Sequence, residues 1–180
     1  MKYSNVPLLR RLVAYGIDWY LATMVCGIPL MLVNSMKTGS TAINTSLPEG
    51  AEGWLWGMVA ILLGLLYYWL IPLLWDGATP GKRLMKLRII SLTSGDTPSS
   101  FALLLRQGVG VLLIEGAIAF PSQLLRELLA RFTGVKVMSI VQTIMVVITM
   151  ISISIGIYTP QKRMIHDYIS GTTEVFVEKE

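Results

Sequence analysis

Four ionisable residues fall within or beside long apolar stretches of this sequence: Arg11, Asp18, Arg106 and Glu115. Arg11 and Asp18 lie seven positions apart, which is nearly two helical turns, so in a helix both side chains point from the same face. A charge that faces lipid is costly, and ionisable groups inside a membrane often mark the path of an ion or proton. The chemistry open to these residues is therefore ion pairing, binding of a small polar solute, or proton transfer.

The position of Asp18 allows two interpretations. Asp18 lies ~10 Å beyond Arg11 along its helix, and Arg106 lies ~7 Å beyond Phe101. The two depths nearly match, which predicts an ion pair of Asp18 with Arg106 or with Arg11. Such a pair could be structural and fix the register of two helices, or it could belong to a polar cavity for an ion or small solute. Glu115 stands alone in the outer half, where it is protonated, in contact with water, or part of a proton relay.

The chain that carries these residues has the composition of a membrane protein. Its 180 residues are 53% hydrophobic and 14% charged, with a mean hydropathy of +0.62, whereas about a quarter of the residues of a soluble domain are charged. A helix needs about 20 apolar residues to cross a bilayer, and four stretches suit this length, at about residues 12–33, 54–75, 101–120 and 137–158. We predict one four-span bundle over residues 1–180.

The positive charges predict how this bundle is oriented. If 101–120 crosses, the segments 1–11, 76–100 and 159–180 share one side and hold 3, 4 and 3 Lys or Arg residues, against 1 and 3 on the other side. The positive-inside rule then places both termini in the cytoplasm. This role of the cations explains the net charge of +4 without a nucleic-acid partner. We expect a multi-pass protein of the inner, cytoplasmic membrane whose surroundings are the lipid bilayer.

Residues 121–136 form an amphipathic stretch between the last two predicted spans. Its leucines at 124, 125, 128 and 129 oppose Arg126, Glu127 and Arg131. A helix with one apolar and one charged face is typical of the membrane interface. We predict that this helix lies on the membrane surface.

Two short stretches outside the spans have strand character. Met85–Leu92 and Thr172–Val177 contain β-branched residues in partly alternating order, and each alone would leave its backbone unpaired. Both lie on the predicted cytoplasmic side, so we predict that they pair in a small cap. The turn at residues 77–81 precedes the first stretch and presents Lys82 and Arg83, which we expect to contact anionic lipid headgroups.

His166 is the only histidine, and Asp167 follows it. A histidine oriented by a carboxylate can act as a base, but neither a Gly-x-Ser-x-Gly elbow nor a His-Glu-x-x-His motif accompanies it. We therefore expect no enzymatic activity, no metal site and no cofactor. Asp167 is expected to cap a turn or to pair with a cytoplasmic arginine.

Four motifs resemble, in order, those of the RDD family of prokaryotic membrane proteins, which is named for one arginine and two aspartates. They are the segment Arg11 to Asp18, the turn Thr79-Pro80-Gly81-Lys82-Arg83-Leu84 with Leu87-Arg88-Ile89-Ile90, the triplet Leu104-Leu105-Arg106, and the segment His166 to Thr172. The resemblance implies that Asp167 is the second aspartate. It further implies a transport role, with cation/proton antiport among the suggestions, or an accessory role beside membrane enzymes. Many relatives carry an acidic residue before the central turn, where this chain has Ile71-Pro72-Leu73 and only later Asp76.

The sequence thus predicts an all-α membrane protein: a four-span bundle with an amphipathic interfacial helix and a small cytoplasmic cap. The expected function is transport of cations or small polar solutes at a charged intramembrane site formed by Arg11, Asp18, Arg106, Glu115 and Asp167. The alternative is a non-catalytic accessory or regulatory subunit that docks on a membrane partner protein or on a second copy of itself. A transporter requires a continuous polar cavity, whereas a docking subunit requires a sealed charge pair and an exposed face of small residues.

Overall fold

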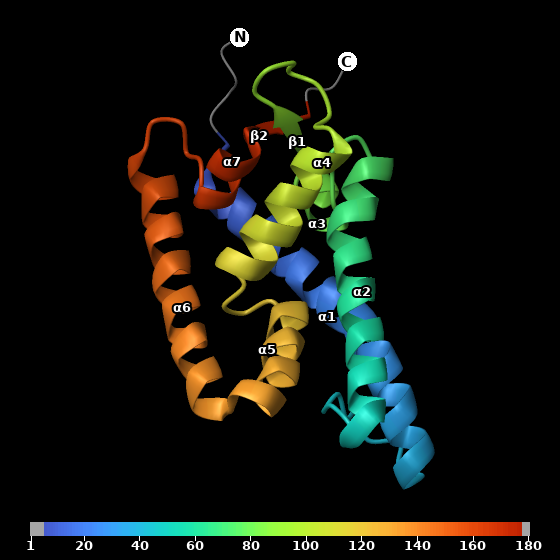
Figure 1. The fold of residues 1–180 in the computed structure, drawn as a ribbon. Helices are drawn as coiled ribbons and strands as arrows, with labels where there is room; N and C mark the ends of the chain where they lie inside the picture. The colour runs from blue at the N-terminus through green and yellow to red at the C-terminus, as the bar shows by residue number, and fades with distance from the viewer. Residues whose placement is uncertain (1–5, 178–180) are drawn as a thin grey trace.

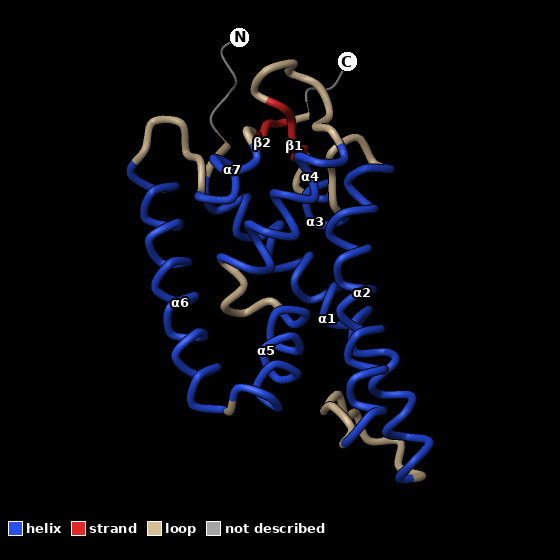
Figure 2. The backbone as a smooth tube through the Cα atoms, viewed as in Figure 1, coloured by secondary structure: helices blue, strands red, loops and turns tan. Residues whose placement is uncertain are grey.

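The computed structural model describes residues 6–177 and is mostly helical (Figures 1 and 2). In chain order its elements are α1 (Leu8–Thr38), α2 (Gly50–Leu74), α3 (Pro80–Leu84), β1 (Leu87–Ser91), α4 (Ser100–Leu104), the π-helix η1 (Leu105–Ile114), α5 (Phe120–Thr133), α6 (Val135–Tyr158), α7 (Ile165–Ser170) and β2 (Thr172–Phe176). The two strands and the short helices α3 and α7 lie at one end of the molecule (Figure 1). We call this the sheet end.

Three helices, α1, α2 and α6, are long and apolar enough to cross a membrane. They cover the stretches predicted at 12–33, 54–75 and 137–158, except that α2 ends one residue earlier at Leu74, which confirms these as long apolar helices. The fourth predicted stretch, 101–120, is not one helix. Helices α4 and η1 together give a shorter apolar segment, Ser100–Ile114, and the number of spans stays a prediction.

The helix breaks at residues 115–119 and resumes as α5. Pro121 sits in the first turn of α5, where its missing N–H is not needed. The Ser122 hydroxyl donates to the Leu112 carbonyl across the break at 2.5 Å, which satisfies an acceptor at the end of η1. The interruption therefore has its own local hydrogen bonding. Helices α4, η1 and α5 follow one another from the sheet end to the opposite end (Figure 1).

Helix α5 packs its apolar face on protein, and its position relative to the membrane surface stays a prediction. Leu124 and Leu128 are fully buried in a cluster that α1 and α2 complete with Cys26, Leu30, Ala60 and Ile61. At its far end, Arg131 donates to the carbonyls of Pro48 and Gly50 at the start of α2. An amphipathic pattern is the same whether the apolar face meets lipid or a protein core, so the sequence could not separate the two.

Small residues let these helices approach closely. A Cβ atom on Gly64 of α2 would lie 2.8 Å from Cys26 Sγ and 2.4 Å from Pro121 Cγ. Ala60, one turn earlier, is also fully buried. Such small pairs bring helix backbones together in membrane proteins, and here they join α1, α2 and α5 into one apolar core.

At the sheet end, β1 and β2 pair antiparallel, from Leu87 opposite Phe176 to Ser91 opposite Thr172. This confirms the predicted pairing of Met85–Leu92 with Thr172–Val177. The Val177 N–H extends the ladder by donating to the Lys86 carbonyl at 2.9 Å. The sheet places the last strand of the chain beside the first turns of α1.

Candidate functional site

Asp18 lies in the middle of α1 and is only 1% exposed. Its carboxylate accepts hydrogen bonds from the Tyr67 hydroxyl at 2.9 Å, from the Gly81 N–H at 2.8 Å and from the Thr79 hydroxyl. Among the described residues it forms no ion pair. The prediction that Asp18 pairs with Arg106 or Arg11 is therefore wrong, because three neutral donors surround its two oxygens.

The N-cap and first turn of α3 supply two of these donors because they reach the backbone of α1. A Cβ atom on Gly81 would lie 2.2 Å from the Ala14 carbonyl oxygen and 2.9 Å from Asp18 Cγ. Only glycine fits at this distance. Thr79 is the N-cap of α3 and is buried. The Thr-Pro-Gly turn is thus pinned to α1 by Asp18.

The two arginines instead share two carboxylates at the sheet end. Arg11 Nη2 lies 2.6 Å from Asp167 Oδ2, and its Nε lies 2.9 Å from Glu174 Oε2. Arg106 Nη2 lies 2.7 Å from Glu174 Oε1, and its Nη1 donates to Asp167 Oδ1. All four side chains are buried. We call Arg11, Arg106, Asp167 and Glu174 the charge cluster.

The charge cluster keeps its carboxylates ionised. Burial by itself raises the pKa of Asp167, but Arg106 and Arg11 lower it by more, so that its pKa lies well below the usual value. Burial also raises the pKa of Glu174, and Arg11, Lys82 and Arg106 together bring it down to about 2. Charge-assisted hydrogen bonds of this kind are stronger than neutral ones. The cluster joins α1, η1, α7 and β2.

Asp167 also accepts the Met164 N–H at 3.0 Å and so caps α7. It therefore caps a turn and pairs with arginines, the two roles that the sequence offered as alternatives. Glu174 was missed. Its only signal was a single carboxylate within the strand-like stretch Thr172–Val177.

The two cations expected at lipid headgroups lie in different surroundings. Lys82 is buried, and its Nζ lies 3.4 Å from Glu174 Oε1. Headgroup contact therefore does not fit Lys82, because the turn that carries it folds inward against α1. Arg83 is exposed, and its guanidinium lies over the Trp75 ring at 5.0 Å.

Glu115 does not stand alone, which corrects the sequence interpretation. Its Oε2 lies 2.9 Å from His166 Nδ1, and its Oε1 accepts from the His166 N–H at 2.9 Å and from the Ser152 hydroxyl at 2.8 Å. His166 Nε2 lies 3.2 Å from Arg106 Nη2. A Cβ atom on Gly110 would lie 2.5 Å from His166 Cβ, so this glycine allows α7 to pack closely on η1. Glu115 is thereby linked through His166 to the charge cluster.

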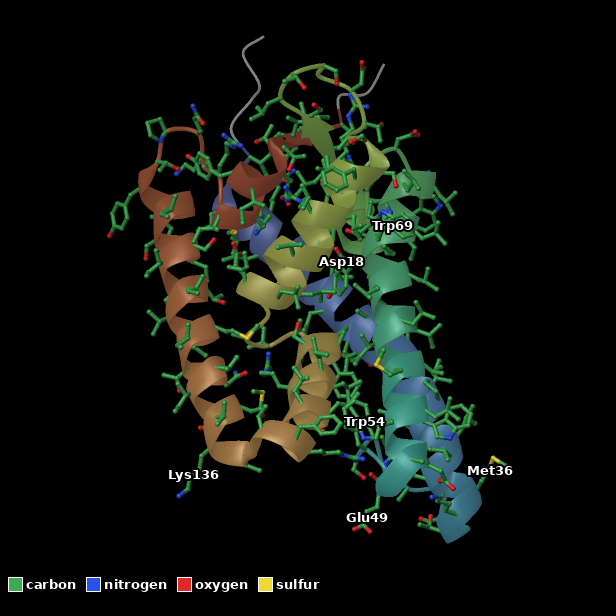
Figure 3. The ribbon with its side chains drawn as sticks, viewed as in Figure 1. Asp18, Met36, Glu49, Trp54, Trp69 and Lys136 are labelled. Carbon is green, nitrogen blue, oxygen red and sulfur yellow. The ribbon has the colours of Figure 1, made fainter. Side chains whose placement is uncertain are left out.

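A cavity of about 200 Å³ lies between α1, η1, α6 and α7. Four of the five residues predicted to form a charged site line it: Arg11, Asp18, Arg106 and Glu115. Asp167, the fifth, is completely buried beside it. Figure 3 shows Asp18 among the helices, well below the sheet end. Lys82, Gln107, His166 and Glu174 also line the cavity, and most of its exposed surface is apolar.

The helix next to this cavity is irregular. In η1 the Glu115 N–H donates to the Gly110 carbonyl, five residues earlier, at 2.9 Å. π-Helical segments are rare and occur mostly at functional sites, and transporters often bind their substrates where a membrane helix is interrupted. Glu115 stands at this interruption. Among the described residues no group of three His, Cys, Asp or Glu side chains is placed to hold a metal ion.

A comparison with protein-family models gives one match, to the RDD family over residues 6–171. The match covers nearly the whole chain. It contains the Arg11-to-Asp18 segment, the Thr79–Gly81 turn, Arg106 and Asp167. No curated protein and no solved structure matches the chain.

Proposed function

The chain belongs to the RDD family, and we propose that it is a four-span protein of the cell membrane that moves a small cation or another small polar solute through the charged cavity, coupled to a proton. Three carboxylates line this cavity, and two of them, Asp18 and Glu115, lie outside the charge cluster. Within residues 6–177 neither forms an ion pair with a lysine or an arginine. This observation carries the proposal, because a carboxylate free of a fixed cation can exchange a proton for a mobile one.

The proposed topology has both termini in the cytoplasm. Helices α1, α2 and α6 would cross as single helices, and α4, η1 and α5 would cross together as one interrupted pass. Non-helical backbone is tolerated at membrane depth where it is buried in protein or lines a cavity. Residues 115–119 meet this condition, because Glu115 and Ile118 line the cavity. The excess of Lys and Arg in the segments at the sheet end supports placing that end inside.

The division of the charges also supports transport. The charge cluster is closed, since each arginine is bound to both carboxylates. Asp18 and Glu115 are instead held by hydroxyl, amide and imidazole groups, which can rearrange around a proton or cation without breaking a buried ion pair. The closed cluster would hold the fold while the other two carboxylates exchange ligands.

A second candidate is a non-catalytic accessory subunit that docks on a membrane partner or on a second copy. Helix α6 favours it, because among its residues only Met145, Ser152 and Gly156 are buried. The rest of this long apolar helix would face either lipid or another membrane protein. In that case the charge cluster and Asp18 would only hold the helices in register.

Transport distinguishes the two candidates. The purified chain is reconstituted in liposomes that contain a pH-sensitive dye, and sodium, potassium or lithium gradients are imposed in turn. We expect cation-driven proton movement in the wild type and loss of most of it in Asp18→Asn and Glu115→Gln. The exposed Glu127→Gln on α5 is the matched control and should keep it. Folded wild-type protein that moves neither protons nor cations would overturn cation/proton transport and favour the subunit.

A further inference from the structure

We propose that the cavity opens sideways into the bilayer between α1 and α6 and binds an amphiphile there, with an apolar body and an uncharged head that carries an oxygen acceptor. The proposal goes beyond transport of a small solute and does not depend on it. It rests on the apolar rim of the cavity and on two buried polar atoms that have no partner.

The rim of the cavity faces the region where lipid would lie. Leu12 of α1 is 40% exposed, and Ile118, in the interruption before α5, is 59% exposed. The opposite side of the cavity is formed by Thr149 and Ile153 of α6, both half-buried. Helix α6 packs chiefly on α5 and hardly contacts α1. Because α1 and α6 are both apolar enough to span, an opening between them leads to hydrocarbon and not to water.

Two polar atoms of residues that line the cavity have no hydrogen-bond partner in the described part of the chain. They are the Tyr68 hydroxyl and Arg106 Nε, and both are buried. A guanidinium Nε–H can only donate, whereas a tyrosine hydroxyl can donate or accept. Buried polar groups in native proteins are normally satisfied. An oxygen acceptor on a bound molecule would satisfy the Arg106 Nε–H or the Tyr68 hydroxyl, and this specifies the head of the ligand.

The charges around the cavity argue that this head is neutral. Both Nη atoms of Arg106 already bind carboxylates, so its Nε–H needs an acceptor but no counter-charge. An anionic head would also face Asp18 and Glu115, which line the same cavity. A cationic head would lie against Arg106. Hydroxyl or carbonyl compounds with an apolar body fit the site best.

The head chemistry can be tested with four probes that share a twelve-carbon chain: 1-dodecanol, dodecanoate, dodecyltrimethylammonium and dodecane. Each competes with a diazirine-bearing dodecanol for photolabelling of the full chain in nanodiscs, without any ion gradient. We expect labels on the peptides that contain Leu12, Ile118 and Ile153. We expect dodecanol to compete about tenfold better than the other three.

Two pairs of variants locate the site. Tyr68→Phe removes only the unpartnered hydroxyl, so the fold should be kept while dodecanol competes about fivefold less well and dodecane is unchanged. Tyr20→Phe, exposed on α1, is its control. Ile153→Trp should fill the opening and abolish the label, whereas Ile151→Trp, on the exposed face of the same helix, should keep it.

The proposal is overturned by any of three results: labelling that Ile153→Trp leaves unchanged, equal competition by dodecanol and dodecane, or strongest competition by a charged probe. Failure of this binding says nothing against transport of a small solute, since no flux is measured. Failure of transport likewise leaves this binding site standing.

Discussion

The two ends of this molecule are held together by different means. At the end opposite the sheet, α1, α2 and α5 meet through leucines, alanines and glycines such as Gly64, with every buried group apolar in that cluster. At the sheet end, α1, η1, α7 and β2 meet through four buried charges. Apolar packing tolerates substitution when volume is kept, whereas a buried ion pair tolerates the loss of neither partner. The charged end should therefore be the more sensitive to small chemical changes.

The largest effect is expected from Asp167→Asn. The change leaves two buried arginines with one carboxylate between them, and removal of one partner of a buried pair costs about 3–5 kcal/mol. Thermal or denaturant unfolding in detergent measures it, with the exposed Asp96→Asn as the control, which should change stability by less than about 0.5 kcal/mol. Equal stability of the two variants would mean that the charge cluster contributes little to the fold.

At the apolar end, Gly64→Ala should destabilise by about 1–3 kcal/mol through overpacking. The added methyl would lie 2.4 Å from Pro121 Cγ and 2.8 Å from Cys26 Sγ. Gly16→Ala, in α1, is the control because its new Cβ would meet no atom within 4 Å. The same unfolding assay compares them, and a Gly64→Ala protein as stable as Gly16→Ala would show that the apolar end is loosely packed.

The charged end should also show a pH dependence that the apolar end lacks. The pKa of Glu174 is about 2 in the folded chain and about 4.3 when it is unfolded. A carboxyl whose pKa is lowered by folding contributes stability that is complete above its unfolded pKa and is lost as the pH falls through its folded pKa. We expect wild-type stability to fall between about pH 4.3 and pH 2.

Glu174→Gln isolates that contribution. Because the glutamine does not titrate, the variant should be less stable at neutral pH, and the difference from wild type should shrink as the pH falls. Unfolding midpoints over this range measure it. A difference that stays constant with pH would contradict the ion pairing of Glu174.

The smallest effect is expected where α6 contacts Glu115 and the start of α7. Ser152→Ala removes one hydroxyl donor from Glu115 and one acceptor from the Ile165 N–H, which should cost about 1 kcal/mol. Ser154→Ala, exposed on the same helix, should cost less. If both changes are neutral in the unfolding assay, Glu115 is not held by α6.

The parts of this architecture that follow from hydropathy could be predicted, because long apolar helices and short β-branched strands are local properties. The partner of Asp18 could not. Rise per residue gives the depth of a side chain along its helix, but not its direction around the axis, and the turn at Thr79–Gly81 occupies the direction that Arg106 would have needed.

At the charged end, Asp167 could be predicted from the sequence and Glu174 could not. Asp167 follows the only histidine of the sequence and belongs to a motif. Glu174 is one carboxylate in a short strand, and it contacts Arg11 only in the folded chain. The interruption at Glu115 was also hidden. The residues around it are apolar enough to continue a helix, and the Ser122 hydroxyl that bonds the Leu112 carbonyl across the break belongs to the next helix, α5.

The central claim is that Asp18 and Glu115 act in transport while the charge cluster maintains the fold. The most direct test is the rate of cation-driven proton movement per folded molecule for Glu115→Gln beside the wild type, in liposomes with equal amounts of inserted protein. We expect a variant that keeps its unfolding midpoint within a few degrees but loses most of the flux. An unchanged flux from Glu115→Gln, at equal folded protein, would contradict it.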